Sequence, residues 1–250
     1  MHIEIGFAVA AVLATFFVGL SKGGMQVTGM LATPILSLQT DPLRAAAILL
    51  PVFIISDAVG VWTFRKRYDA RNLSILIPSA FFGIFLGWLL AASVPERAVA
   101  AMIGVIGLAY VLYAHSGLRR LSATQHRPNR VVGWICGMLS GFTSFVSHSG
   151  APPYQIYVLP QRLDKLVYAG TSAIVFASMN AAKLVPYWAL GEFPASTLKI
   201  SMMLVPVGVL STLLGVYLVK VIPQRAYYTL AEILLAGISV QLIYSSLAGP

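Results

Sequence analysis

Charged residues are scarce in this chain. Only 10% of its 250 residues are Asp, Glu, Lys or Arg, whereas 58% are hydrophobic. An ordinary soluble domain has about 25% charged and roughly 45–50% apolar residues, so this composition excludes a water-soluble globular protein, a disordered chain and a nucleic-acid-binding domain. Because a spanning helix needs ~20 apolar residues, the chain has room for about six to eight spans. The composition therefore predicts a single transmembrane domain over residues 1–250.

Cysteine and acidic residues are also rare. Cys136 is the single cysteine and lies in an apolar run, which excludes a disulfide framework or a zinc site. No group of His, Cys and acidic residues has metal-ligand spacing, and no cofactor is expected. The 17 basic residues outnumber the eight acidic ones, but eight of the 17 gather in two short clusters at 65–71 and 119–130. Neither cluster forms the contiguous basic face with stacking aromatics that nucleic-acid binding requires.

Long apolar stretches predict the membrane crossings. Six of them can span fully, at roughly 44–64, 72–94, 97–115, 165–190, 196–219 and 226–246. Two others are interrupted: residues 5–38 break at 19–24, and residues 131–160 break at 147–153. Their return limbs are too short to cross a core of ~30 Å at ~1.5 Å per residue. The sequence therefore predicts an all-α polytopic membrane protein with two re-entrant helical hairpins.

The basic loops predict the orientation. Loops 65–71 and 116–130 are separated by two spans and so face the same side, which the positive-inside rule assigns to the cytoplasm. Counting crossings from there places both termini outside. We therefore expect a multi-pass protein of the cytoplasmic (inner) membrane.

The two halves of the chain resemble each other. Pro78 and Gly87 recur as Pro206 and Gly215 at the same spacing, and Asp57 matches Asn180 at a slightly shorter one. We expect an inverted repeat, in which each half is one hairpin plus three spans. The predicted boundaries are repeat 1 over about 1–115, a cytoplasmic linker over 116–130 and repeat 2 over about 131–250. Inverted repeats of this kind are typical of secondary transporters, whose broken helices meet near the midplane.

Ionisable residues inside the membrane are functional candidates by default. Lys22 lies at the first hairpin tip, before Gly23 and Gly24, whose backbone N–H groups we expect to be uncovered at the start of a half-helix that favours an oxyanion. The alternative is that Lys22 snorkels or pairs with an acid. His148 takes the equivalent place in the second hairpin and can carry a proton near neutral pH, or it holds the hairpin through backbone bonds. We expect Lys22 and His148 to meet near the midplane.

Three further charged residues lie within predicted spans. Asp57 is either the counter-charge of Lys22, exchanging protons during the cycle, or a structural partner that positions the hairpin. Lys183 shares one helical face with Asn180 and Tyr187, at i−3 and i+4, and this face can either donate to a sulfonate or form a polar seam. Glu232, close to a predicted membrane face, is expected to be an interfacial or packing residue.

Four motifs together resemble the TauE/SafE family of sulfite and organosulfonate exporters, over nearly the whole chain. The motifs are Gly19-Leu20-Ser21-Lys22-Gly23-Gly24; Ala47-Ile48-Leu49-Leu50-Pro51 followed by Asp57; His148 through Pro153 with Tyr157-Val158-Leu159-Pro160-Gln161; and Asn180 with Lys183-Leu184 and Pro186-Tyr187. The resemblance implies a membrane transporter for small sulfur-containing anions.

The leading hypothesis is a secondary transporter that exports sulfite or an organosulfonate by alternating access, coupled to protons. The open alternatives are an uptake permease for the same anions, an intramembrane enzyme and a membrane scaffold subunit. The expected partners are the anion, protons and the lipid bilayer, without nucleic acid, and oligomerisation is left open. The candidate substrate-binding residues are Ser21, Lys22, Gly23, Gly24, His148, Ser149, Gly150, Gln155, Thr171, Asn180, Lys183 and Tyr187. The candidates for proton coupling or charge pairing are Asp57 and His148.

Overall fold

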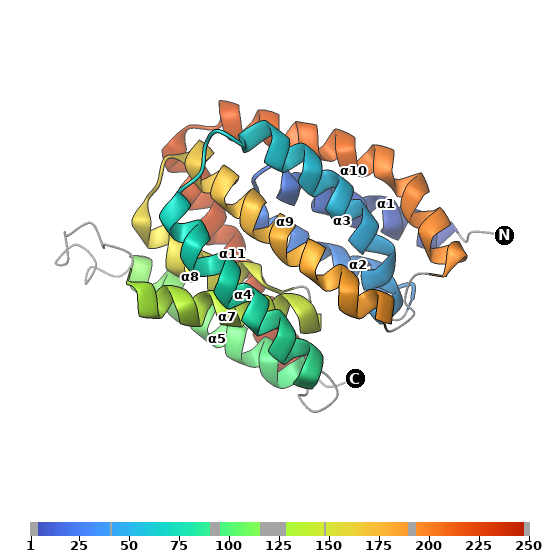
Figure 1. Cartoon of the computed structure of the whole chain (residues 1–250), viewed down its shortest axis with the longest axis horizontal. Helices are drawn as coiled ribbons and strands as arrows, with labels where there is room; N and C mark the ends of the chain where they lie inside the picture. Colours follow the sequence, from blue (N-terminus) through green and yellow to red (C-terminus); the bar gives the residue numbers. More distant parts are fainter. Residues whose placement is uncertain are drawn as a thin grey trace. The chain divides into compact units, whose positions relative to one another are not determined.

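The computed structural model describes residues 5–40, 42–90, 96–115, 129–147, 149–189 and 194–247, and within these ranges it is helical without strands (Figure 1). The elements are α1 (Ile5–Lys22), η1 (Gln26–Leu31), α2 (Ala32–Ser37), α3 (Pro42–Phe64), α4 (Ala70–Leu90), α5 (Glu96–His115), α7 (Arg130–Ser147), α8 (Ala151–Val158), η2 (Leu159–Gln161), α9 (Lys165–Ala189), α10 (Ala195–Val221) and α11 (Gln224–Leu247). The predicted all-α fold is confirmed.

Five helices are long and apolar enough to cross a membrane: α1, α3, α4, α10 and α11. Four of them coincide with predicted full spans. α1 was expected only as the first limb of a hairpin, yet its 18 residues make it long enough to cross by itself. The helices predicted at 97–115 and 165–190 are present as α5 and α9.

Both predicted breaks are present, and each return limb packs back along the first. At the first break, η1 and α2 lie against α1, and Gly24 has a φ of +115°, a conformation that favours glycine. The N–H groups of Gly23 and Gly24 donate to the carbonyls of Gly19 and Ser21, at 2.9 and 3.0 Å. They therefore cap the end of α1 and do not lie uncovered as expected, because the chain continues into a short 3-10 helix.

The second break is closed by hydroxyl groups of α7. Ser140 Oγ donates to the carbonyl oxygen of Gly150 at 2.6 Å. Thr143 Oγ1 donates to the carbonyl oxygen of Ser149 at 3.1 Å, while the N–H of Ser149 donates back to the carbonyl oxygen of Thr143. These bonds turn the chain sharply before α8, which packs against α7.

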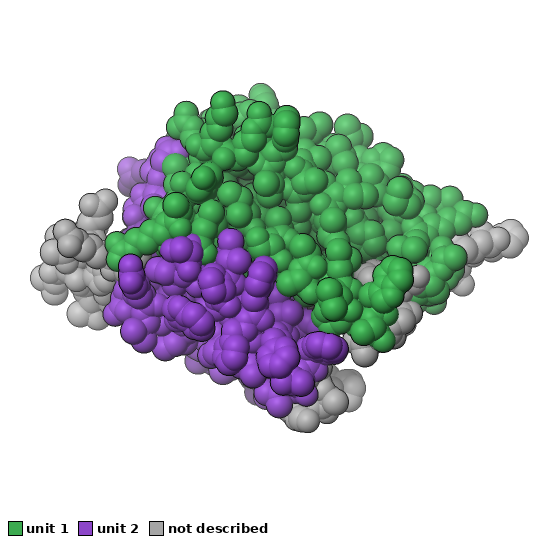
Figure 2. Space-filling model, viewed as in Figure 1, with its two compact units in different colours: residues 1–73, 165–223 green, residues 74–164, 224–250 purple. Residues whose placement is uncertain are grey.

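The helices form two compact units, shown in Figure 2. Unit 1 comprises residues 1–73 and 165–223, and unit 2 comprises residues 74–164 and 224–250. Each unit combines helices from both predicted repeats. In unit 1, α3 packs against α1, α9 and α10 around buried aliphatic residues such as Ile48, Leu49 and Leu204.

A seam of small residues joins α1 to α10 in unit 1. A Cβ added to Gly23 would lie 2.5 Å from the Cα of Gly215 and 2.5 Å from the carbonyl oxygen of Thr212. Four residues earlier, Gly19 meets the backbone of Gly208 in the same way. The two backbones therefore touch directly, as small residues allow in membrane helices.

Unit 2 contains a comparable seam between α4 and α7. A Cβ on Gly83 would overlap the carbonyl oxygen of Met138, and a Cβ on Gly87 would lie 3.1 Å from Phe145 Cβ. Elsewhere in this unit α5 packs along α11. Glu232 on α11 accepts a hydrogen bond from Arg162 Nη2 at 2.7 Å. Its ion-pair partner is therefore the residue that directly follows the second hairpin.

Candidate functional site

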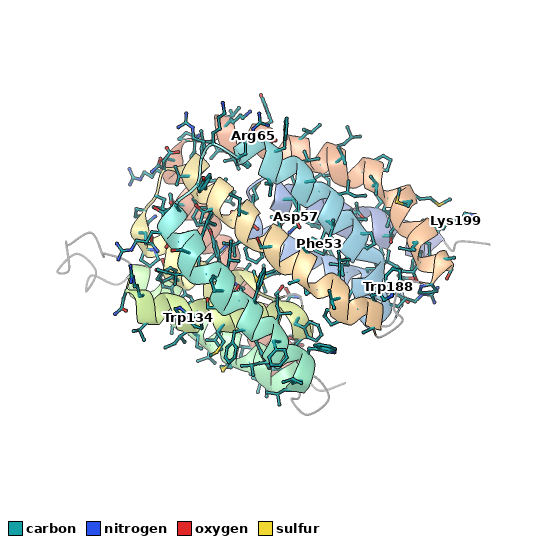
Figure 3. The ribbon with its side chains drawn as sticks, in the orientation of Figure 1. Phe53, Asp57, Arg65, Trp134, Trp188 and Lys199 are labelled. Atoms are coloured by element: carbon teal, nitrogen blue, oxygen red, sulfur yellow. The ribbon has the colours of Figure 1, made fainter. Side chains whose placement is uncertain are left out.

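Among its described residues, unit 1 buries three charged side chains. Lys22 ends α1, Asp57 lies within α3 and Lys183 lies within α9, and their exposed fractions are 3%, 4% and 1%. In Figure 3, Asp57 lies along α3, away from Arg65 at the end of that helix and from Lys199 on α10. Burying a charge is costly unless it is paired, so the partners of these groups decide what the site can do.

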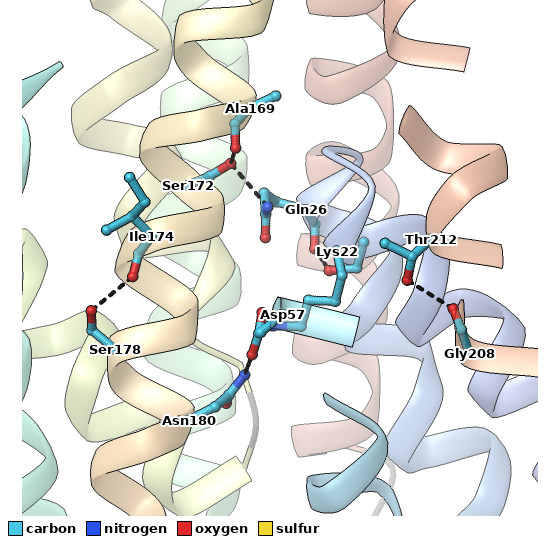
Figure 4. A network of polar contacts seen from close by, with 11 residues as sticks. Lys22, Gln26, Asp57, Ala169, Ser172, Ile174, Ser178, Asn180, Gly208 and Thr212 are labelled. Atoms are coloured by element: carbon cyan, nitrogen blue, oxygen red, sulfur yellow. Dashed lines mark hydrogen bonds and ion pairs between the residues drawn. The ribbon is translucent and has the colours of Figure 1, made fainter. Parts of the chain in front are cut away.

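Lys22 and Asp57 form an ion pair with 2.8 Å between Nζ and Oδ1. The second carboxylate oxygen, Oδ2, accepts a hydrogen bond from Asn180 Nδ2 at 2.6 Å. The three side chains come from α1, α3 and α9 and point toward one another in Figure 4. Lys183 lies on α9 one turn after Asn180 and interacts electrostatically with both Lys22 and Asp57. We call Lys22, Asp57, Asn180 and Lys183 the buried ion cluster.

Aromatic rings line the cluster around the ammonium group. Lys22 Nζ lies 4.8 Å from the ring centroid of Phe53 and 5.7 Å from that of Phe176. Such contacts stabilise a cation through the ring quadrupole while keeping water away. Charges in this environment interact more strongly than they would at a solvated surface.

The buried ion cluster carries more positive than negative charge. It contains two lysines and one aspartate, so with all three ionised its net charge is +1. An isolated positive charge in a low-dielectric interior favours binding of an anion. Tyr187 is buried one helical turn beyond Lys183 on α9.

The hairpin tip is also tied to α9 by a polar bridge. Gln26 Nε2 donates to Ser172 Oγ at 2.9 Å, and Ser21 Oγ donates to the carbonyl oxygen of Gln26 at 3.1 Å. Gln26 and Ser172, together with Phe53 and Phe176, were not identified from the sequence. Gln26 follows the glycine break closely, which is a local signal, but its partner lies 146 residues away.

The remaining predicted site residues lie elsewhere in the units. Thr171 Oγ1 accepts from the N–H of Asp69 at 2.9 Å and donates to the carbonyl oxygen of Val167, which fastens α9 to the loop after α3. In unit 2, Gln155 is buried on α8, and its Oε1 has no hydrogen-bond partner among the described residues. His148 lies outside the described residues, so its expected meeting with Lys22 stays a prediction.

Across the part of the chain that the structure describes, no group of three His, Cys, Asp or Glu residues could hold a metal ion. The buried ion cluster offers ammonium, carboxylate and amide groups, and the phenol of Tyr187 lies one turn further along α9. Such groups bind an oxyanion through charge and hydrogen bonds.

Comparison with known proteins gives one clear finding. A family model described as "Sulfite exporter TauE/SafE" matches residues 7–242, a range that contains every member of the buried ion cluster and the breaks of both hairpins. A search of curated proteins and a search of solved structures each found no match.

Proposed function

Because this chain belongs to the TauE/SafE sulfite exporter family, it is a membrane transporter and not an enzyme, and we propose that the buried ion cluster binds its sulfur-containing anion. The observation that carries this proposal is the presence of two buried lysines with a single aspartate in unit 1. With all three charged groups ionised, a bound monoanion would bring the net charge of the cluster from +1 to zero. Burying a neutral occupied site in a low-dielectric interior costs less free energy than burying a site with a net charge.

The geometry of the cluster suits a sulfite or sulfonate group. These groups present several acceptor oxygens around one sulfur atom, and the cluster offers two ammonium groups and the Asn180 amide as donors. Tyr187 adds a hydroxyl on the same face of α9. The rings of Phe53 and Phe176 beside Lys22 keep these donors out of water, which strengthens each charge-assisted hydrogen bond.

We further propose that transport is export by alternating access, coupled to protons through Asp57 or His148. The inverted repeat underlies this proposal, and contacts between matched residues support it. Asp57 and Asn180, which the sequence comparison pairs, are hydrogen-bonded to each other. The matched glycines also make equivalent contacts. Gly87 packs against α7 and Gly215 packs against the end of α1, and each of these helices is the first limb of a hairpin. Equivalent residues meet in this way where two repeats are related by a two-fold axis.

Ligand-dependent stability tests the function directly. We expect purified protein in detergent to melt at a higher temperature with one or more of sulfite, sulfate, thiosulfate, taurine and sulfoacetate, because a ligand that binds only the folded state stabilises it by mass action. A stabilisation of roughly 2.7 kcal/mol corresponds to a ligand at about 100 times its Kd. Sodium chloride at equal ionic strength is the control, and equal melting temperatures in all solutions would contradict the proposal.

The orientation can be tested with cysteine labelling. We expect a cysteine at Ala248 to react with an impermeant thiol reagent in intact cells, and a cysteine at Ala123 to react only after permeabilisation, both in a Cys136→Ser background. The reason is the positive-inside rule, which places the loop containing Ala123 in the cytoplasm. Labelling of position 123, but not of position 248, from outside would reverse the proposed topology.

A further inference from the structure

We propose that Asp57 is a tethered competitor of the transported anion, which must displace the Asp57 carboxylate from Lys22 before it can bind. This inference rests on the proposed function of the buried ion cluster and adds a determinant of its affinity. The starting observation is that both carboxylate oxygens are engaged, one by Lys22 Nζ at 2.8 Å and the other by Asn180 Nδ2 at 2.6 Å.

A carboxylate and a sulfur oxyanion seek the same donors. Each binds through negatively charged oxygens that accept charge-assisted hydrogen bonds from ammonium and amide groups. In the structure those donors already bind Asp57, so the anion-free cluster holds an internal oxyanion in place of an external one. The local concentration of this internal ligand is high because it is part of α3, and effective concentrations for short tethers reach the millimolar range.

Lys183 is a second cation that acts on the Asp57 carboxylate. Among the described residues, the charged groups in electrostatic range of Asp57 are Lys22 from α1 and Lys183 from α9. α10 also packs on α3, but its two lysines, Lys199 and Lys220, lie near its ends, and neither η1 nor α2 contains a charged residue. When an anion takes Lys22, the Asp57 carboxylate keeps a cationic neighbour and does not become an isolated buried charge.

This arrangement explains why the cluster has two lysines for one aspartate. With Lys22 alone, displacing Asp57 would leave a buried carboxylate without a counter-charge, which is strongly unfavourable. With Lys183 alone, the anion and the Asp57 carboxylate would have to share a single ammonium group. Competition from Asp57 thus limits the affinity of the site for the anion and raises the rate of anion dissociation. A transporter must release its substrate in every cycle.

Isothermal titration of thiosulfate into the purified protein tests the inference. We expect Asp57→Asn, which keeps the side-chain shape but removes the negative charge, to bind thiosulfate at least tenfold more tightly than the wild type. In Asp57→Ala, formate should compete with thiosulfate, because a free carboxylate can enter the vacated space, whereas the wild type should be much less sensitive to formate. The matched control is Glu232→Gln, which removes a buried carboxylate of unit 2 and should bind thiosulfate like the wild type.

A second measurement needs no substitution at Asp57. We expect thiosulfate to shift the antisymmetric carboxylate stretch in the infrared difference spectrum of the wild type, and to do so equally in Glu232→Gln. Unchanged or weaker binding by folded Asp57→Asn, or an unchanged carboxylate band in the wild type on binding, would overturn the competitor role and leave the anion site standing. If the wild type binds none of the sulfur anions, the proposed function itself fails.

Discussion

Replacing Gly23 with alanine should destabilise the protein by about 3 kcal/mol, near the upper end of the effects of overpacking. The added Cβ would lie 2.5–2.6 Å from Gly215 Cα, the Thr212 carbonyl oxygen and the Val216 nitrogen. All three are backbone atoms of α10, so no side chain can rotate away to make room. Thermal unfolding in detergent, followed by circular dichroism, measures the loss.

Gly237 provides the matched control. It lies inside α11, and a Cβ added there would meet nothing within 4 Å. Because glycine is a poorer helix former than alanine by roughly 0.8–1.0 kcal/mol, Gly237→Ala should leave the melting temperature unchanged or raise it. Equal melting temperatures for the Gly23 and Gly237 variants would contradict the close backbone contact between α1 and α10.

Replacing Lys22 with methionine should have two separable effects. Stability should fall by roughly 3–5 kcal/mol, the range observed when one partner of a buried ion pair is removed, because Asp57 loses its closest counter-charge. Anion affinity should fall at least tenfold, since a hydrogen bond to a charged group contributes about 1.5–3 kcal/mol. Thermal unfolding and titration with thiosulfate measure the two effects independently.

The double variant Lys22→Met/Asp57→Asn separates structure from binding. It removes both charges of the pair, so most of the lost stability should return, whereas thiosulfate binding should remain weak. Lys22→Arg should restore binding only in part, because a planar guanidinium differs in shape from an ammonium between the Phe53 and Phe176 rings. Recovery of both stability and binding in the double variant would remove Lys22 from the anion site.

The sequence predicts the helices of this protein well and their partners poorly. The ends of α3, α9, α10 and α11 fall within a few residues of the predicted spans, because hydropathy is a property of each segment alone. Both breaks were also locally encoded by glycine, serine and proline. What could not be predicted is which helix faces meet.

The site shows the same limit. The sequence singled out Lys22, Asp57 and Lys183 as unusual charges in apolar helices, and it left open whether Lys22 has an acidic partner. The ion pair answers that question. Asn180 was named as a candidate for the substrate site, but its hydrogen bond to Asp57, 123 residues earlier in the chain, was not predicted. The sequence predicted that the N–H groups of Gly23 and Gly24 would be free to bind an anion. In the structure they cap the end of α1, because the turn directs them toward the last carbonyl groups of that helix.

The glycine seam also has a mechanical consequence. Contact of backbone with backbone leaves no flexible side chain to absorb a shift, and packed interiors transmit strain, so we expect the hairpin tip and α10 to move together. The end of α10 next to this seam is held by Lys165, whose Nζ donates to the carbonyl oxygens of Lys220 and Ile222 at 2.8 and 2.5 Å. We therefore expect a displacement of Lys22 in the protein interior to move this exposed end of α10.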